Sequence, residues 1–263
     1  MLTAWGSRGL DTPNAPAEPR RPPAAVWRSL ASNRALHLLL GAIVITSFST
    51  TMFSKNLLYY FKYVVGDADM GSLGLGAIAL TVVVTTPLWA IALRVIGKRN
   101  TWLVGAVPSV LGLTLWHFAD GQTLGVLFAA LVLQGVGIAA GVVCFWSMLP
   151  DTVEYGEWRS GVRTESLVFG LTVLGQKVAL GLGAGALGIA LTQFGYVPNV
   201  AQSPQTLADI KGLMFWAPLV GTLAAAALIC FYPINRRTHA AMVEEISARN
   251  GAADAAPSPP QAS

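Results

Sequence analysis

The chain has 263 residues, of which 54% are hydrophobic and only 11% carry a charge, and its formal net charge is +4. A soluble domain usually has about a quarter charged residues, so too few polar side chains remain here to cover a soluble core, whereas a lipid-facing surface needs none. The basic residues form small clusters between apolar runs, which excludes a nucleic-acid-binding stripe and indicates the orientation signals of a membrane protein.

The chain opens with a segment rich in Pro, Ala and Arg that contains no apolar run of signal-peptide length. Such a composition cannot bury enough apolar surface to fold, so we expect residues 1–34 to be disordered and cytoplasmic. The membrane domain is expected over residues 35–235, and residues 236–263 are expected to form a cytoplasmic C-terminal tail.

Six long apolar runs follow one another along the chain. A helix needs roughly 20 apolar residues to cross the bilayer core, and most of the runs reach that length. The sequence therefore predicts an all-α membrane protein with six transmembrane helices. The runs cover residues 35–63, 73–96, 101–118, 123–149, 166–194 and 210–232.

The loops between the runs alternate in charge. Lys and Arg gather in the cytoplasmic loops of membrane proteins, so we expect both termini to be cytoplasmic and the protein to lie in the cell (inner or plasma) membrane. The basic side carries Arg20, Arg21, Arg28, Arg34, Arg94, Lys98, Arg99, Arg159, Arg163, Arg236 and Arg237, and the opposite side carries Asp67, Asp69, Asp120 and Asp209 with Lys62 and Lys211.

Two lysines lie inside apolar runs, where a lysine at the helix centre costs about 2.5–3.5 kcal/mol on insertion. Lys55 lies toward the outer end of its run, so its long side chain is expected to reach the headgroups, unless it has a functional role. Lys177 lies near the middle of its run and has no interface to reach. We expect it to face a water-filled cavity or an anionic partner, unless it joins two helices purely for structure. Gln176 adds a polar group at the same depth, about 100° around the helix.

The run that contains Lys177 is also rich in glycine. Gly181 and Gly185 form a GxxxG pair, which lets a neighbouring backbone approach closely. Ordinary helix packing is the expected role of most of these glycines.

The segment between the fourth and fifth runs reads LPDTVEYGEWRSGVRTES. Asp151, Glu154 and Glu157 recur at every third residue, so on a helical turn they would share one face, and Arg163 and Glu165 follow closely. Two interpretations stay open for this segment. It is either a solvated charge cluster or a cytoplasmic ion-pair network that locks and releases two helical bundles.

As an enzyme site the charged segment is weak. It has no nucleophile paired with a base, no set of metal-ligand histidines and no glycine loop that could hold a phosphate. Cys144 and Cys230 fall in apolar runs and provide neither a disulfide nor a zinc framework. We expect no enzyme activity, no metal site and no cofactor.

The charged segment is also the centre of a family resemblance. DTVEYGEWRSGVRTESLVFG, followed by the pair Gln176–Lys177, closely resembles the glycoside–pentoside–hexuronide:cation symporters, the melibiose permease family. GYVPNVAQSPQTL is similar to that family's external loop between helices eleven and twelve. VWRSLASNRALHLLL resembles its central cytoplasmic loop entering helix seven, and YYFKYVVG the end of that helix. The resemblance covers roughly residues 26–237.

This resemblance implies a major facilitator fold, in which two six-helix halves rock around a central site and each half is a pair of three-helix inverted repeats. Only the equivalents of helices seven to twelve are present, the C-terminal half. In the family, most of the cation site and the main sugar-recognising acids lie in the N-terminal half. The chain is therefore expected to need an N-terminal six-helix half.

The resemblance also implies roles for particular residues. Lys177 matches the family's helix-eleven lysine, implicated near the cation site and in coupling. Gln176 lies beside it, and Trp146 is a looser match that could line the cavity. The residues that match the family's charged loop motif, expected to form a cytoplasmic gate, are Asp151, Glu154, Glu157, Arg163 and Glu165.

The implied function is symport of a sugar or glycoside with Na⁺ or H⁺, in a membrane-lipid environment and with no nucleic-acid partner. Two alternatives remain: a membrane fragment that does not transport, and a carrier of a lipid or other non-sugar solute. An apolar lining opposite Lys177 would favour a lipid carrier, whereas a polar, aromatic-edged cavity would favour a sugar.

Overall fold

The structure, a computed structural model, describes residues 22–119 and 123–254. Every regular element in these ranges is a helix, and six of them are long and apolar enough to cross a membrane, which confirms the predicted fold class. The six are α3 (Arg34–Tyr60, continued by the π-helical turn η1, Phe61–Val65), α4 (Ala68–Ile96), α5 (Lys98–Phe118), α6 (Leu124–Ser160), α7 (Glu165–Gln193) and α8 (Pro204–Cys230), flanked by α2 (Pro23–Ser32) and α9 (Arg236–Asp254).

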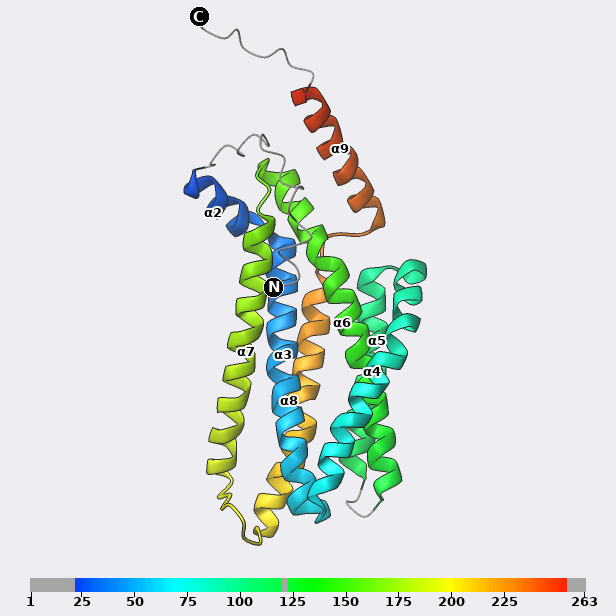
Figure 1. Ribbon diagram of the computed structural model, residues 1–263, viewed down its shortest axis with the longest axis vertical. Helices are drawn as coiled ribbons and strands as arrows, with labels where there is room; N and C mark the ends of the chain where they lie inside the picture. Colours follow the sequence, from blue (N-terminus) through cyan, green and yellow to red (C-terminus); the bar gives the residue numbers. More distant parts are fainter. Residues whose placement is uncertain (1–21, 120–122, 255–263) are drawn as a thin grey trace, which may run out of the picture.

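The six long helices alternate in direction along the bundle (Figure 1). Because α3–α5 and α6–α8 begin at opposite ends, the two sets have the relative orientation of inverted three-helix repeats. One end of the bundle carries most of the charge, and we call it the basic end. It contains α2, the α4–α5 junction, the end of α6 and α9. The opposite end, with η1 and the α7–α8 loop, is called the acidic end. The cations of the basic end include Arg28, Arg34, Arg94, Lys98, Arg99, Arg159, Arg163 and Arg237, and the acidic end holds Asp67, Asp69 and Asp209 with Lys62 and Lys211.

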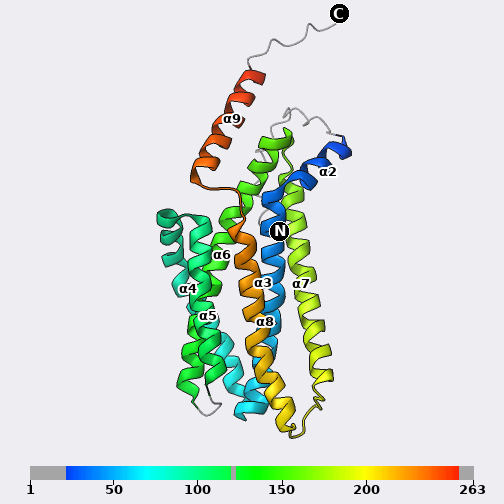
Figure 2. The same cartoon turned by 180° about the vertical axis from the view of Figure 1, so that it is seen from behind.

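Helix α3 packs most extensively on α8 and α7, while α6 packs on α5 and α4 (Figure 2). The apolar core is divided into two clusters along α3. One cluster lies toward the basic end around Leu36 and Leu39, and the other lies toward the acidic end around Leu57, Phe61 and Trp116. The polar middle of α3 lies between the two clusters, so the core leaves room there for a cavity.

Close helix crossings depend on small residues. A Cβ on Gly112 of α5 would lie 2.7 Å from the carbonyl oxygen of Ala130 on α6. On α7, a Cβ on Gly183 would lie 2.8 Å from the carbonyl oxygen of Phe48, whereas Gly181 and Gly185 have nothing within 4 Å of that position. The close approach of α7 to α3 therefore uses Gly183 and not the GxxxG pair.

The turns are set by residues suited to them. Gly66 adopts a left-handed φ of 87° after η1, and Asp67 then caps α4 by accepting from the amide of Asp69 at 3.0 Å. At the other end of α4, Gly97 has a φ of 85° and joins α4 to α5 without any longer loop. Ser203 caps α8 through the amide of Thr206.

The sequence predicts disorder up to residue 34, and this is wrong for residues 23–32, which form α2. Pro23 occupies the first turn, where its fixed φ suits a helix start. Leu30 and Ser29 are buried, and the hydroxyl of Ser160 donates to that of Ser29 at 2.8 Å, so the helix is held against the end of α6. Residues 1–21 lie outside the described residues, as does Asp120.

The fourth transmembrane helix is longer than its apolar run. The run ends at Leu149, but α6 continues to Ser160 and stops where Gly161 adopts a left-handed φ of 69°. The charged segment that the sequence places in a loop is therefore mostly helix, and only residues 161–164 connect α6 to α7.

Candidate functional site

A cavity of about 590 Å³ lies at the middle of the bundle, between the two apolar clusters. Its wall comes from α3, α4, α5, α6, α7 and α8, so helices from both three-helix sets contribute, and about half of its lining residues are apolar. Trp102 provides an aromatic ring. The polar residues that line it are Thr46, Ser47, Ser49, Thr50, Thr51, Ser54, Lys55, Ser109, Gln134, Gln176 and Thr222.

The hydroxyls come mainly from the sequence TSFSTTMFS of α3. Thr46 and Thr51 donate to the carbonyls one turn earlier, of Ala42 and Ser47, at 2.8 and 2.7 Å. Each hydroxyl oxygen therefore keeps lone pairs that can accept from a solute. Oε1 of Gln134 is buried and has no hydrogen-bond partner within the described residues. The hydroxyl oxygens of α3 can thus accept hydrogen bonds from a solute with many O–H groups, whereas Oε1 of Gln134 lies behind the cavity surface.

The predicted cavity residues separate in the structure. Gln176 lines the cavity, whereas neither Lys177 nor Trp146 is part of its wall. Adjacent residues of a helix point about 100° apart, so one of the pair Gln176–Lys177 faces inward and the other outward. Trp146 is 51% exposed and packs edge-on against Phe145. Lys55, which the sequence predicts to reach the headgroups, lines the cavity.

Lys177 lies on an exposed face of α7. One turn before it on the helix lies Leu174, which is 60% exposed, and Gly181 follows one turn later with open space beyond its Cα. This face has no neighbour within the described part of the chain, although it carries a charge at the depth of the membrane. A lysine in this position is costly against lipid, so the face is suited to a further protein surface.

The basic end contains the charges that the sequence predicts to form a gate. Asp151 of α6 is its centre: Nζ of Lys98, at the start of α5, lies 2.7 Å from both carboxylate oxygens. Asp151 is buried, with its side chain 7% exposed, while that of Lys98 is 33% exposed. This pair joins α6 to the α4–α5 junction.

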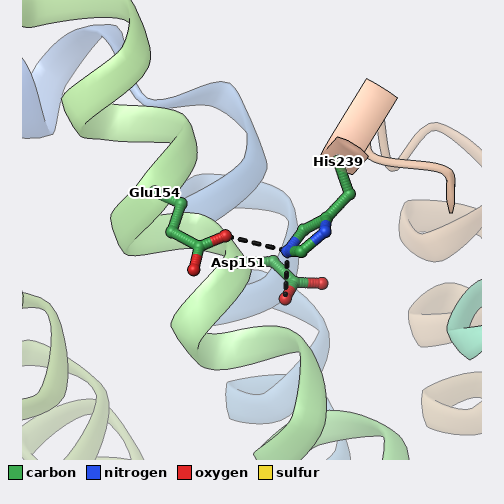
Figure 3. A group of neighbouring side chains, drawn as sticks. All are labelled: Asp151, Glu154 and His239. Atoms are coloured by element: carbon green, nitrogen blue, oxygen red, sulfur yellow. Dashed lines mark ion pairs between the residues drawn. The ribbon is translucent and has the colours of Figure 1, made fainter. Parts of the chain in front are cut away.

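A histidine from α9 completes the cluster (Figure 3). Nε2 of His239 lies 2.8 Å from a carboxylate oxygen of Glu154 and 3.5 Å from one of Asp151. One ligand atom from each of the three residues lies within 4.8 Å of the others, a spacing that could hold a metal ion. The ammonium group of Lys98 already supplies positive charge to Asp151. The contacts with His239 hold α9 against α6.

The remaining gate residues form a second group. Arg163 pairs with Glu165 at 2.8 Å and with Glu157 at 3.1 Å, bridging the end of α6 and the start of α7. The hydrogen bond to Glu165, followed by that to Glu157, raises the pKa of Arg163 above its ordinary value. The side chain of Arg163 is 52% exposed, so the bridge is a surface contact.

The helix around Pro150 is braced by side chains from other elements. Proline has no N–H and interrupts the helical hydrogen bonds. Lys98 donates to the carbonyl of Ser147 at 2.8 Å, and Asn33 donates to that of Thr152 at 2.7 Å. Tyr232 donates to the carbonyl of Met148 at 3.4 Å. Burial, aided by the charge of Asp151, raises the pKa of Tyr232 well above its ordinary value, so this hydroxyl stays protonated.

Sequence reasoning missed two partners in the cluster and most of the cavity wall. Lys98 was available only as an orientation signal, and His239 lies beyond the last span, so neither position indicates contact with Asp151. The run of hydroxyls in TSFSTTMFS was a usable signal, because six hydroxyl residues within nine positions of a membrane helix need hydrogen-bonding surroundings.

Comparison with known proteins adds to this geometry. The family model described as MFS/sugar transport protein matches residues 1–236. An isoprimeverose transporter of Lactiplantibacillus pentosus is 36% identical over 188 residues, 70% of this chain and 38% of that protein. A protein of Escherichia coli (strain K12) named "Putative 2,3-dihydroxypropane-1-sulfonate exporter" is 34% identical over 89% of this chain and 51% of its own length. A glucuronide carrier protein homolog of the same organism is 30% identical over 84% of this chain and 49% of its length. The chain spans about half the length of the curated relatives it matches.

Proposed function

Because the chain belongs to the MFS/sugar transport protein family, we propose that it works as half of a secondary active transporter that carries a sugar or glycoside together with Na⁺ or H⁺. The observation that carries this proposal is the polar cavity at the middle of the membrane helices. The wall of this cavity is mixed, because about half of its lining residues are apolar. Its hydroxyl and amide groups suit a solute with many hydroxyl groups, and its apolar residues with Trp102 suit the apolar faces of a sugar ring. The names of relatives, an isoprimeverose transporter and a glucuronide carrier protein homolog, support a sugar-type solute.

In this proposal the chain catalyses no chemical reaction and needs no cofactor beyond the coupling cation. It spans the cell membrane several times with both termini in the cytoplasm, because Lys and Arg favour that side. The basic end then faces the cytoplasm, and Lys62 and Lys211 lie among the external acids.

We further propose that the partner is an N-terminal six-helix half. The support is the unpartnered face of α7, where Lys177 is exposed beside Gly181. A second half packed there would cover the lysine, could supply an anionic group to it, and would close the open side of the cavity. Lys177, with Gln176 on the cavity wall, would then lie where substrate and cation are coupled; Trp146, also exposed, would face the same shared space.

The charged groups of the basic end are proposed to form a cytoplasmic gate. Asp151 and Glu154 hold the α4–α5 junction and α9, and Arg163 holds α7 to α6 through Glu157 and Glu165. Opening of this end would break the exposed contacts of Arg163 more readily than the buried pair of Asp151, because exposed ion pairs contribute little stability.

The test is ion-gradient-driven uptake into vesicles. The chain is reconstituted alone and together with the N-terminal six-helix half of a family relative, and uptake of a labelled neutral glycoside and a labelled glucuronide is measured under Na⁺ and H⁺ gradients. We expect uptake only when both halves are present. Lys177→Ala should abolish gradient-driven uptake, whereas Lys62→Ala, at the acidic end, should leave it in place.

Three results would decide against the proposal. Robust uptake by the chain alone, abolished by Lys177→Ala, would contradict the need for a second half. No uptake with any N-terminal half, despite correct insertion, would favour a membrane fragment that does not transport, and movement of lipid in place of glycoside would favour a lipid carrier.

A further inference from the structure

A second cavity, of about 730 Å³, lies at the basic end and is separate from the central one. It is formed by the α4–α5 junction, by Asp151 of α6 and by the segment that leads into α9. Its charged and polar lining residues are Arg94, Lys98, Arg99, Asn100, Asp151, Asn235, Arg237 and His239, and its apolar ones are Leu93, Ile96 and Ile234, with Gly97 at the turn.

The charge of this cavity is strongly positive. Among the described residues that line it, four are cations and one is an acid, Asp151, which is already paired with Lys98 at 2.7 Å. Glu154, just behind the wall, is paired with His239. Counting four cations against these two acids leaves a net charge of +2 with His239 neutral and +3 with it protonated. The first turn of α5 also lines the cavity, and a helix N-terminus adds partial positive charge.

The cavity lies at the level where the membrane ends. Ile96 is the last residue of the candidate span of α4, and Lys98 is the first of the candidate span of α5. The outer face of α4 directly below is apolar and exposed, with Ile91 61% and Val95 68% exposed. A ligand with a negative head and apolar tails could therefore place its head among the arginines and its tails along α4.

We propose that this cavity is a binding site for the phosphate headgroup of an anionic phospholipid. Free phosphate shares the chemistry of the headgroup, but the exposed apolar strip on α4 and the position at the end of the spans favour the lipid. Arg99 and Arg237, which approach the cavity from α5 and α9, would bind the phosphate from two sides. Such binding would also fix α9 to the α4–α5 junction.

The experiment uses the full chain purified in detergent and measures lipid binding by native mass spectrometry. Phosphatidylglycerol is compared with phosphatidylcholine carrying the same acyl chains. We expect a clear preference for phosphatidylglycerol in the wild-type chain. The pair Arg99→Gln and Arg237→Gln should lower phosphatidylglycerol affinity about tenfold or more, since each basic residue near an anionic surface contributes about fivefold.

The matched control is the pair Arg28→Gln and Arg34→Gln, two exposed arginines of the same end that do not line the cavity. This pair should keep the preference, and all variants should keep helical circular dichroism and a single elution peak. If the first pair misfolds, Arg99→Lys with Arg237→Lys, which keeps both charges, should still prefer phosphatidylglycerol.

Three outcomes would overturn the proposal. The first is equal binding of the two lipids by the wild-type chain. The second is an equal loss of affinity in the cavity pair and in the control pair. The third is displacement of phosphatidylglycerol by millimolar inorganic phosphate, which would assign the cavity to a free anion.

Discussion

The ion pair between Asp151 and Lys98 is the most buried charged contact at the basic end. Asp151→Asn would leave Lys98 partly buried without its counterion, and we expect a loss of about 1–3 kcal/mol of stability, below the range for fully buried pairs because Lys98 is a third exposed. Glu165→Gln, which removes a pair at the exposed surface, should cost less than about 1 kcal/mol. Thermal unfolding in detergent measures both.

A double-mutant cycle with Lys98→Gln isolates the pair from the other contacts of Asp151. If Asp151→Asn and Glu165→Gln destabilise the protein equally, the distinction drawn from burial is wrong. The uptake assay tests the gate with a further variant. We expect Glu157→Gln, which removes one of the two partners of Arg163, to change exchange rates with little loss of protein.

At this scale the sequence predicted part of the site. Asp151 and Glu154 do meet at His239, whereas Glu157 belongs to a separate group. Arg163 does meet Glu157 and Glu165, because all three are close in the chain. The contacts of Asp151 with Lys98 and His239 could not be predicted, since they depend on how α5 and α9 are placed by the packing of the whole bundle.

Helix α7 offers a matched test at the scale of elements. Gly183→Ala would place a Cβ 2.8 Å from the carbonyl oxygen of Phe48, so α7 and α3 must separate, and we expect a loss of about 1–3 kcal/mol. Gly185→Ala, two residues later, meets open space and should be neutral or slightly stabilising, by up to about 1 kcal/mol, from helix propensity. Thermal unfolding of the isolated chain compares the two.

Gly185→Ala, which is harmless to the stability of the isolated chain, is expected to matter for transport when a partner half is present. If Gly185 packs against that half, Gly185→Ala should reduce uptake by the two-half transporter while leaving the stability of the isolated chain unchanged. Equal stability losses for the two variants in the isolated chain would contradict the α3–α7 packing described above.

The sequence pattern predicts the number of membrane helices, but it does not predict where each helix ends. The six apolar runs predicted six helices, because lipid imposes both length and composition on each span. The end of α6 was not predicted, because an apolar run indicates only where the helix leaves the membrane. The helix itself continues in water until Gly161, where the backbone changes to a left-handed conformation.

Orientation is a property of the whole molecule and can be tested with single cysteines. In a background with Cys144→Ser and Cys230→Ser, Asp67→Cys and Asn199→Cys should react with an impermeant maleimide from outside intact cells, whereas Arg99→Cys should react only after the cells are opened. The reason is that basic residues gather on the cytoplasmic side. Labelling of Arg99→Cys but not of Asp67→Cys in intact cells would reverse the proposed orientation.

The bracing of α6 has a mechanical consequence. The 37 residues of α6 span roughly 55 Å, nearly twice the apolar thickness of a bilayer, so the helix can act as a lever. A proline is normally the point at which such a lever bends, but at Pro150 the neighbouring carbonyls are tied to Asn33, Lys98 and Tyr232. Movement of the part of α6 after Pro150 should therefore also move the starts of α3 and α5 and the segment after α8. We expect these parts to rotate together as one rigid unit.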